Sequence, residues 1–241
     1  MLLVGNGRLI TRDEAFPYAE DGAVALDGEV IKEVGALSEL RAKYPDAEFV
    51  DARGGVIMPG LINVHTHIYS GLARGLSIDG FNPTNFLEVL DGQWWYIDRH
   101  LTLDGTRACA YATVLDCIQD GVTTIFDHHA SFCEIPGSLF AIKDVCQELG
   151  IRANLCYEVS ERDGAEKCGQ AIRENADFAR WAKEQDDDMV KAMFGGHALF
   201  TISDKTFDRM VAANNGRVGY HIHVSEGMND VYDSLQNYGR R

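Results

Sequence analysis

The feature that most constrains the fold is the alternation of strand-like and helical segments from about residue 56 onward. Short apolar or β-branched runs are each followed by a longer stretch with helical periodicity. This order is typical of βα units whose strands form a parallel sheet. We count five such units, with strands expected at 56–65, 121–126, 151–159, 189–194 and 218–224, and helices at 84–119, 136–150, 165–185, 203–213 and after 227.

Residues 1–55 have a different rhythm, with short strands separated by turns. Asp27-Gly28 is a strong hairpin dipeptide between two apolar runs, 39–43 predicts one helical turn, and 48–51 predicts a last short strand. This β-module is too small for a core of its own. We therefore predict two domains, 1–55 and 56–241.

The number of βα units leaves two α/β architectures open. Five units can close an open, doubly wound sheet, whereas a (β/α)8 TIM barrel needs eight units and about 250 residues. Residues 56–241 are too few for a complete barrel. A barrel would therefore be partial, short by about three units.

Composition excludes several classes of function. The net charge of −15 disfavours nucleic acid and anionic membrane surfaces as partners. The sequence has neither a secretory leader nor an apolar run of about 18 residues that would span a membrane. None of the six cysteines forms a CxxC pair, so we expect free, buried thiols and a cytoplasmic location. Small neutral or cationic substrates fit this composition best.

Two His-x-His pairs end predicted strands. On a strand, residues two apart point to the same face, so His65 and His67 project together, as do His221 and His223. Imidazole pairs of this kind suit zinc and similar metals. Glu226 follows where the last strand gives way to a loop, and a carboxylate there can move protons beside a metal-bound water. The alternative is that two polar strand ends have no common role.

Other polar and aromatic residues are ambiguous. Asp127-His128-His129 and His197 also end strands, where a structural role is as reasonable as contact with a substrate. The run 94–96 (Trp-Trp-Tyr) can line a pocket or pack a helix on the core. The GxSxG elbow, the phosphate-binding loop and the dinucleotide fingerprint are absent from the sequence.

Three stretches resemble the amidohydrolase superfamily, specifically its aminohydrolase and chlorohydrolase-type branch. PGLINVHTHIYSGLARGL, from Pro59, resembles the opening of the barrel in that branch. GVTTIFDHHAS, from Gly121, resembles the second barrel strand, and HVSEG, from His223, resembles the HxxE motif of the fifth. Within the branch, the sequence is most similar to SsnA-type aminohydrolases.

The resemblance implies a metallo-dependent barrel, with residues 1–55 as the N-terminal part of an accessory β-sandwich. It implies one divalent metal ion, zinc first and iron as the alternative, because no lysine ends the fourth strand to bridge two metals. The implied metal ligands are His65, His67 and His223, with Glu226 as the proton shuttle. We also assign a substrate-binding role to His197, His128 and Arg74. The family needs two further residues, a histidine on strand six and an aspartate on strand eight, which would lie beyond residue 241.

The resemblance implies a hydrolase acting on non-peptide carbon–nitrogen bonds, which deaminates a small amino- or amidine-bearing compound. Two alternatives remain, a chlorohydrolase acting on a triazine-like ring and a non-catalytic metal-binding fragment. We expect the 241-residue chain alone to be inactive, since the aspartate that activates water is not among its residues. The expected partner is a small-molecule substrate, with a homodimer of the full-length protein left open.

Overall fold

The computed structural model describes residues 1–185 and 187–240. Its chain divides into two compact units, Met1–Gly60 and Leu61–Arg241, and each is described separately.

The first unit is a β-sheet with one helix. Its elements are β1 (Leu2–Ile10), β2 (Tyr18–Asp27), β3 (Val30–Ala36), α1 (Leu37–Lys43), β4 (Glu48–Asp51) and β5 (Val56–Ile57). The sheet order is β3-β2-β1-β4, and β5 also pairs with β1. The predicted hairpin is confirmed, because Asp27 pairs with Val30 across a turn in which Gly28 has φ 60°. A small core of Leu3, Ala23, Ala25 and Leu40 joins the helix to the sheet, so the prediction that this module has no core of its own is wrong.

The second unit alternates strands and helices. Its strands are β6 (Leu61–Thr66), β7 (Val122–His129), β8 (Arg152–Tyr157), β9 (Val190–Ala192), β10 (Phe194–Ala198) and β11 (Tyr220–His223). Its α-helices are α2 (Phe86–Val89), α3 (Trp95–Asp98), α4 (Leu103–Gln119), α5 (Ser138–Leu149), α6 (Gly164–Gln185), α7 (Asp204–Asn214) and α8 (Met228–Tyr238). Short 3-10 turns follow at Ile68–Ser70 and Leu199–Thr201.

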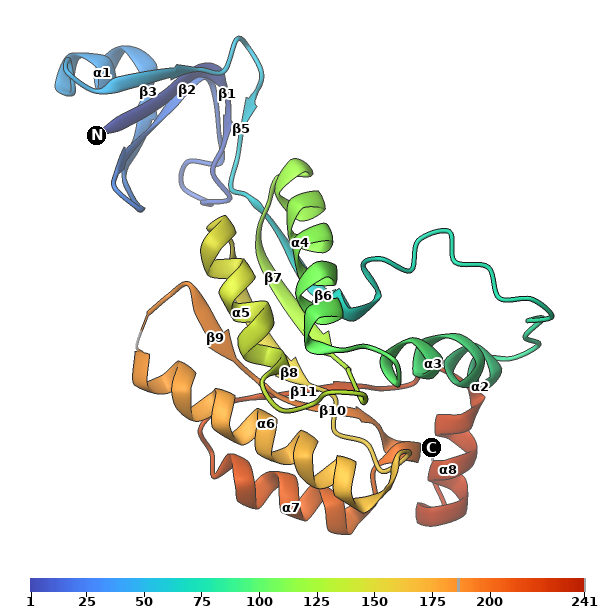
Figure 1. Ribbon diagram of the computed structural model, residues 1–241. Coiled ribbons are helices and arrows are strands. Elements are labelled where there is room, and N and C mark those ends of the chain that lie inside the picture. The colour runs from blue at the N-terminus through green and yellow to red at the C-terminus, as the bar shows by residue number, and fades with distance from the viewer. Residues whose placement is uncertain (186, 241) are drawn as a thin grey trace. The chain divides into compact units, whose positions relative to one another are not determined.

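The strands of this unit are parallel. Their order is β6-β7-β8-β9, β10 pairs with β11, and a bridge between Val159 and Gly196 joins the end of β8 to β10. Helices α4, α5, α6 and α7 lie together on one side of the strands (Figure 1). The predicted α/β class, with an N-terminal β-module before parallel βα units, is confirmed. Since the strands are parallel, their carboxyl ends meet at one edge.

Three predicted elements are wrong in detail. The strand expected at 56–65 is split into β5, which pairs with β1, and β6, which pairs with β7. The long helix expected at 84–119 is broken into α2, a π-helical turn (Leu90–Trp94), α3 and α4. The break follows Asp98, whose carboxylate is buried against Arg162, and α4 restarts where the Thr102 side chain accepts a hydrogen bond from the Gly105 N–H. The fourth strand is also split at Met193, because β9 pairs with β8 whereas β10 pairs with β11.

One buried side chain from α6 bridges the ends of β8 and β10. The Asn175 amide donates to the Tyr157 carbonyl (2.7 Å), and its oxygen accepts from the N–H groups of Tyr157 (2.9 Å) and Gly195 (3.1 Å). A Cβ at Gly195 would lie 2.3 Å from the Tyr157 carbonyl oxygen, so only glycine permits this approach. These contacts fix the strand ends that carry Glu158 and His197.

The cysteine prediction is confirmed except at one residue. All six are free thiols and five are buried, but Cys133 is exposed because it lies in the loop before α5. Within the described residues, the structure contains no helix with the length and apolar character needed to cross a membrane.

Candidate metal centre and its pocket

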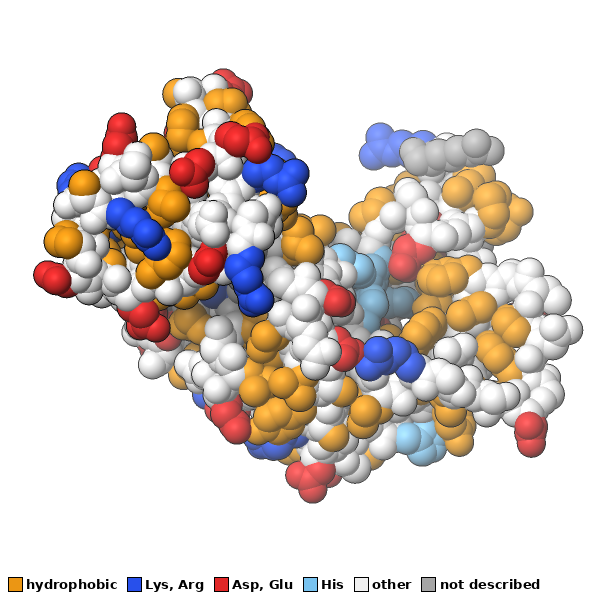
Figure 2. Space-filling view, turned by 90° about the horizontal axis from the view of Figure 1, so that it is seen from above, with side chains coloured by type: hydrophobic (Ala, Val, Ile, Leu, Met, Phe, Trp, Pro, Cys, Tyr) orange, Lys and Arg blue, Asp and Glu red, His pale blue; other side chains and the backbone are white. Residues whose placement is uncertain are grey.

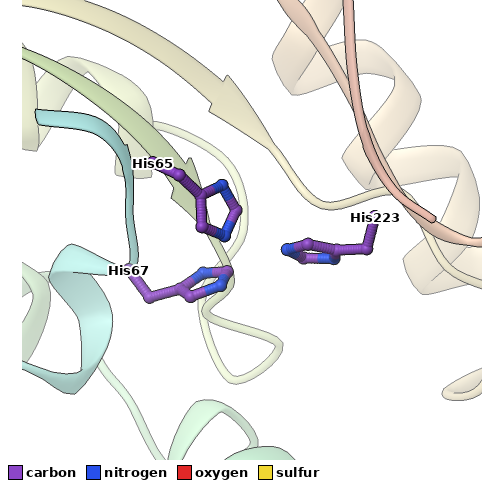
Figure 3. A group of neighbouring side chains, drawn as sticks. All are labelled: His65, His67 and His223. Carbon is purple, nitrogen blue, oxygen red and sulfur yellow. The ribbon is translucent and has the colours of Figure 1, made fainter. Parts of the chain in front are cut away.

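The histidines predicted as metal ligands come together at the carboxyl edge of the sheet. His65 is the penultimate residue of β6, His67 follows that strand directly, and His223 ends β11. One ring nitrogen from each lies within 4.8 Å of the others. Figure 3 shows the three rings turned toward one another across the gap between the two strands. Segments more than 150 positions apart in the sequence thus converge on one point.

Hydrogen bonds orient these rings in a way that suits metal binding. The Nδ1–H of His67 donates to the His128 carbonyl oxygen (2.7 Å), which leaves the Nε2 lone pair free. Nδ1 of His65 lies 2.9 Å from Nε2 of His221, so donation from His65 leaves its Nε2 free as well. His221, which the sequence pairs with His223 but to which the resemblance assigns no role, therefore orients a neighbouring ring.

The surroundings of His223 show whether the residues at this site suit a metal ion. Both of its ring nitrogens are buried, and neither has a hydrogen-bond partner among the described residues. A buried polar atom without a partner is costly, so some group is expected to satisfy it. Three imidazoles with free nitrogens are a donor set for zinc or a similar divalent ion. The residues present therefore fit the metal that the sequence implies.

The environment keeps these rings neutral, as ligation requires. Burial, together with the nearby His128, lowers the pKa of His67 to about 4 and the pKa of His221 to about 4. The same two causes lower the pKa values of His65 and His223. At neutral pH each ring therefore keeps a lone pair available for a metal.

Glu226 lies beside the cluster, on the loop after β11. One of its carboxylate oxygens lies within 4.8 Å of ring nitrogens of His197 and His223. Asp230 fixes the loop, because its Oδ2 accepts from the backbone N–H groups of Glu226 (3.0 Å) and Gly227 (3.3 Å). Burial, with Asp230 close by, raises the pKa of Glu226. A carboxyl group with a raised pKa is suited to carrying a proton.

The last three residues of β7, Asp127, His128 and His129, divide between structural and site-facing roles. Oδ1 of Asp127 accepts from the Ile68 N–H (2.7 Å) and so anchors the turn after the His65–His67 pair. His128 reaches the cluster: its ring lies 4.3 Å from that of His223, and its Nε2–H donates to the Gly196 carbonyl oxygen (3.0 Å). His129 points away and bonds Ser131.

His197 and Arg74, predicted to bind substrate, lie in different places. His197 is buried, and Thr201 bonds its Nδ1 at 2.7 Å. Its ring is 5.6 Å from that of His223. Arg74 is three-quarters exposed and pairs with Asp116 on α4, so the structure does not bring it to the histidine cluster. The Arg-Gly pattern from which Arg74 was predicted corresponds to a turn, in which Gly75 has φ 77°.

The prediction missed Glu158, which lies one position after β8. This carboxylate is 3% exposed, and Oε2 lies 3.7 Å from Nδ1 of His128. Burial alone would raise its pKa, but His197, His128 and Arg162 outweigh burial and hold the pKa well below the usual range. A polar residue at the end of a strand was the available signal, as it was for His197.

A pocket of about 220 Å³ opens onto the cluster. It is lined by His67, Tyr69, Ser70, Phe86, Leu90, Trp94, Trp95, Glu158, His197, His223 and Glu226. Figure 2 shows histidine side chains gathered in a hollow beside hydrophobic ones. A larger hollow of about 800 Å³ shares Trp95 but contains none of the candidate ligands, so we take the smaller pocket as the site.

Parallel βα units with imidazoles and a carboxylate at the carboxyl edge are typical of metal-dependent barrel hydrolases. The chain belongs to the amidohydrolase family, whose profile matches residues 56–241. A second profile, the imidazolonepropionase-like composite domain of bacteria, matches residues 22–47.

Curated relatives agree with this membership. The chain is 28% identical over 240 residues to the 5'-deoxyadenosine deaminase of Methanosarcina barkeri, covering 99% of this chain and 52% of the relative. It is 31% identical over 243 residues to the 5-methylthioadenosine/S-adenosylhomocysteine deaminase of Thermococcus onnurineus, covering 99% and 53%. The chain thus spans about half the length of these curated relatives.

The similar solved structures establish the fold. An adenosine deaminase from Xanthomonas campestris with bound zinc matches with a TM-score of 0.78 and 22% identity, covering 100% of this chain and 53% of that one. The atrazine chlorohydrolase TrzN of Arthrobacter aurescens, complexed with zinc, matches with a TM-score of 0.79 and 24% identity, covering 100% and 56%.

Proposed function

We propose that the protein is a metal-dependent hydrolase that deaminates a small amino- or amidine-bearing compound. The observation that carries the proposal is the convergence of His65, His67 and His223, with Glu226 beside them, next to a pocket that His67, His223 and Glu226 line. The names of the curated relatives, which are deaminases of adenosine-type compounds, support the same reaction class. The finer assignment to SsnA-type aminohydrolases remains a prediction.

In this proposal the three histidines hold one divalent ion, zinc first and iron as the alternative. Such an ion, when bound, lowers the pKa of a coordinated water to about 7 and so supplies a nucleophile at neutral pH. Glu226 carries a proton to the substrate nitrogen, a role that its raised pKa favours. His197 and His128 contact the substrate, and the indoles of Trp94 and Trp95 form an apolar wall that excludes water.

The activity belongs to the whole protein. The family pattern implied by the sequence also uses a histidine and an aspartate from later strands, and the relatives are about twice the length of this chain. We therefore propose metal binding by the 241-residue chain and turnover by the full-length protein.

Metal analysis tests the ligand assignment. We expect the wild-type chain, dialysed against zinc and then buffer, to retain about one zinc per chain, and the His65→Ala/His67→Ala variant to retain far less. The control is His100→Ala, which removes an exposed histidine that bonds the Tyr96 carbonyl oxygen outside the cluster. Equal zinc in the double variant and the wild type would contradict the assignment.

The reaction class is tested on the full-length protein with adenosine-type and other amino-bearing compounds, by measuring ammonia release. Chloride release from a chlorinated triazine, without ammonia release from any amine, would favour the chlorohydrolase alternative. Neither product, from a protein that retains zinc, would favour a non-catalytic metal-binding role.

A further inference from the structure

Glu158 lines the pocket, but the mechanism above gives it no task. It lies directly after β8, where the bond from its N–H to the His129 carbonyl oxygen (2.7 Å) fixes the backbone. A buried carboxylate at the wall of a pocket is costly unless something pairs with it. The residues that pair with Glu158 therefore indicate its role.

Arg162 pairs with Glu158 from behind the pocket wall. Its Nη2 donates to Oε1 of Glu158 (3.2 Å) and to Oδ2 of Asp98 (2.7 Å), and its Nη1 donates to Oδ1 of Asp98 (3.3 Å). The guanidinium lies over the rings of Phe132 (4.0 Å) and Trp95 (5.0 Å). Since guanidinium does not lose its proton in proteins, this contact keeps Glu158 ionised.

The second carboxylate oxygen of Glu158, Oε2, is not paired with Arg162. Among the described residues, no hydrogen bond reaches Oε2. Nδ1 of His128 lies 3.7 Å from Oε2, which is too far for a hydrogen bond. His128 is engaged elsewhere, since its Nε2–H donates to the Gly196 carbonyl oxygen (3.0 Å). An ionised oxygen with free lone pairs thus remains beside the pocket.

The rest of the pocket wall suits a flat, electron-poor group. Four aromatic side chains line it, Tyr69, Phe86, Trp94 and Trp95, and no lysine or arginine is among the lining residues. Indole rings attract cations placed over their faces, and carboxylates accept paired N–H groups. The pocket therefore offers aromatic walls and a fixed acceptor, with no fixed positive charge that would bind an anion.

We propose that Glu158, held by Arg162, selects substrates that present a cationic or N–H-rich planar group, such as an amidinium, to Oε2 inside this pocket. The inference rests on the proposed function only in treating the pocket as the substrate site. It goes further by naming the chemistry that the site recognises. The competing interpretation is that Glu158 only completes a structural ion pair with Arg162.

A matched pair of ligands separates the two interpretations. Benzamidine is planar and cationic at neutral pH, whereas benzamide has nearly the same shape and no charge. Binding is followed by tryptophan fluorescence, since two of the three tryptophans line the pocket. Chelator-treated protein is used, so that the result does not depend on a bound metal.

We expect Glu158→Gln to weaken benzamidine binding by about tenfold or more, because a charge-assisted hydrogen bond is lost, and to leave benzamide binding unchanged. Glu166→Gln, which removes a carboxylate from the exposed side of α6, should leave both affinities unchanged. Equal benzamidine affinity in Glu158→Gln and wild type, equal losses for both ligands, or no benzamidine binding by the wild type would each overturn the proposal.

A second variant covers the case in which Glu158→Gln does not fold, as judged by circular dichroism. Glu158→Asp keeps the charge but shortens the reach, so benzamidine binding should weaken while benzamide binding does not. Unchanged benzamidine binding in Glu158→Asp would then overturn the proposal. If the Glu158 proposal fails this test, the zinc-retention and ammonia-release measurements are not affected. Failure of the proposed substrate selection can therefore be distinguished from failure of the proposed deaminase function.

Discussion

Replacing Arg162 with methionine should be one of the most destabilising single changes in the second unit. Methionine keeps an apolar stem between Phe132 and Trp95 but removes all three hydrogen bonds to Asp98 and Glu158. The Arg162 side chain is 5% exposed, and its two acidic partners are no more than 3% exposed, so water cannot replace the lost cation. Breaking a buried pair in this way costs about 3–5 kcal/mol.

Urea unfolding followed by tryptophan fluorescence measures this loss in the second unit, which contains all three tryptophans. The control is Arg180→Met, which removes an exposed pair with Asp177 and should cost less than about 1 kcal/mol. The Arg162→Met loss should also shrink between pH 8 and pH 5. Burial raises the pKa of Asp98 to about 7 even beside Arg162, and without the cation this pKa rises further, so protonation toward pH 5 relieves the cost. A loss no larger than that of the control, or one that grows toward pH 5, would refute the reasoning.

Three further changes test the site and its frame. Asn175→Ala removes the side chain that bonds Tyr157 and Gly195, and should lower the free energy of unfolding by about 3 kcal/mol in the same urea assay. His223→Leu removes two buried nitrogens without partners, so the metal-free chain should lose no stability beyond about 1 kcal/mol, while the rise of its thermal midpoint with zinc disappears. Zinc retention should persist at pH 5.5, since the pKa of His67 is lowered to about 4; half-loss near pH 6.5, the usual value for histidine, would contradict this.

Much of the second unit could be predicted because strand and helix periodicities differ. The strand that ends at His129 and the helix capped by Ser203 are both local patterns, and the structure has both. The predicted long helix failed because its interruption depends on a distant partner. Asp98 turns inward to meet Arg162, 64 positions later, and no local pattern reports that contact.

The candidate site was predictable where the chemistry is carried by a motif. His65 and His67 share a strand face by the two-residue repeat alone, and their approach to His223 follows from parallel strands. Glu158 was not found, because a single carboxylate after a strand is no motif. Its significance depends on Arg162 behind it and on the pocket in front. Arg74 shows the opposite error, since its motif was local but its side chain pairs with Asp116 at the surface.

The distribution of unsatisfied polar atoms separates the site from the rest of the sheet. On α6, the buried amide of Asn175 has its hydrogen bonds completed by backbone groups of Tyr157 and Gly195. At the carboxyl edge, His223 has two buried nitrogens without a partner among the described residues, and His128 has one. Each such atom costs about 1–3 kcal/mol in a fold with only a narrow margin of stability. The hydrogen bonds of Asn175 show that this fold can satisfy buried polar groups, so the unsatisfied nitrogens at the carboxyl edge are best explained by a bound group. Imidazoles that burial keeps neutral indicate that this group is a metal cation.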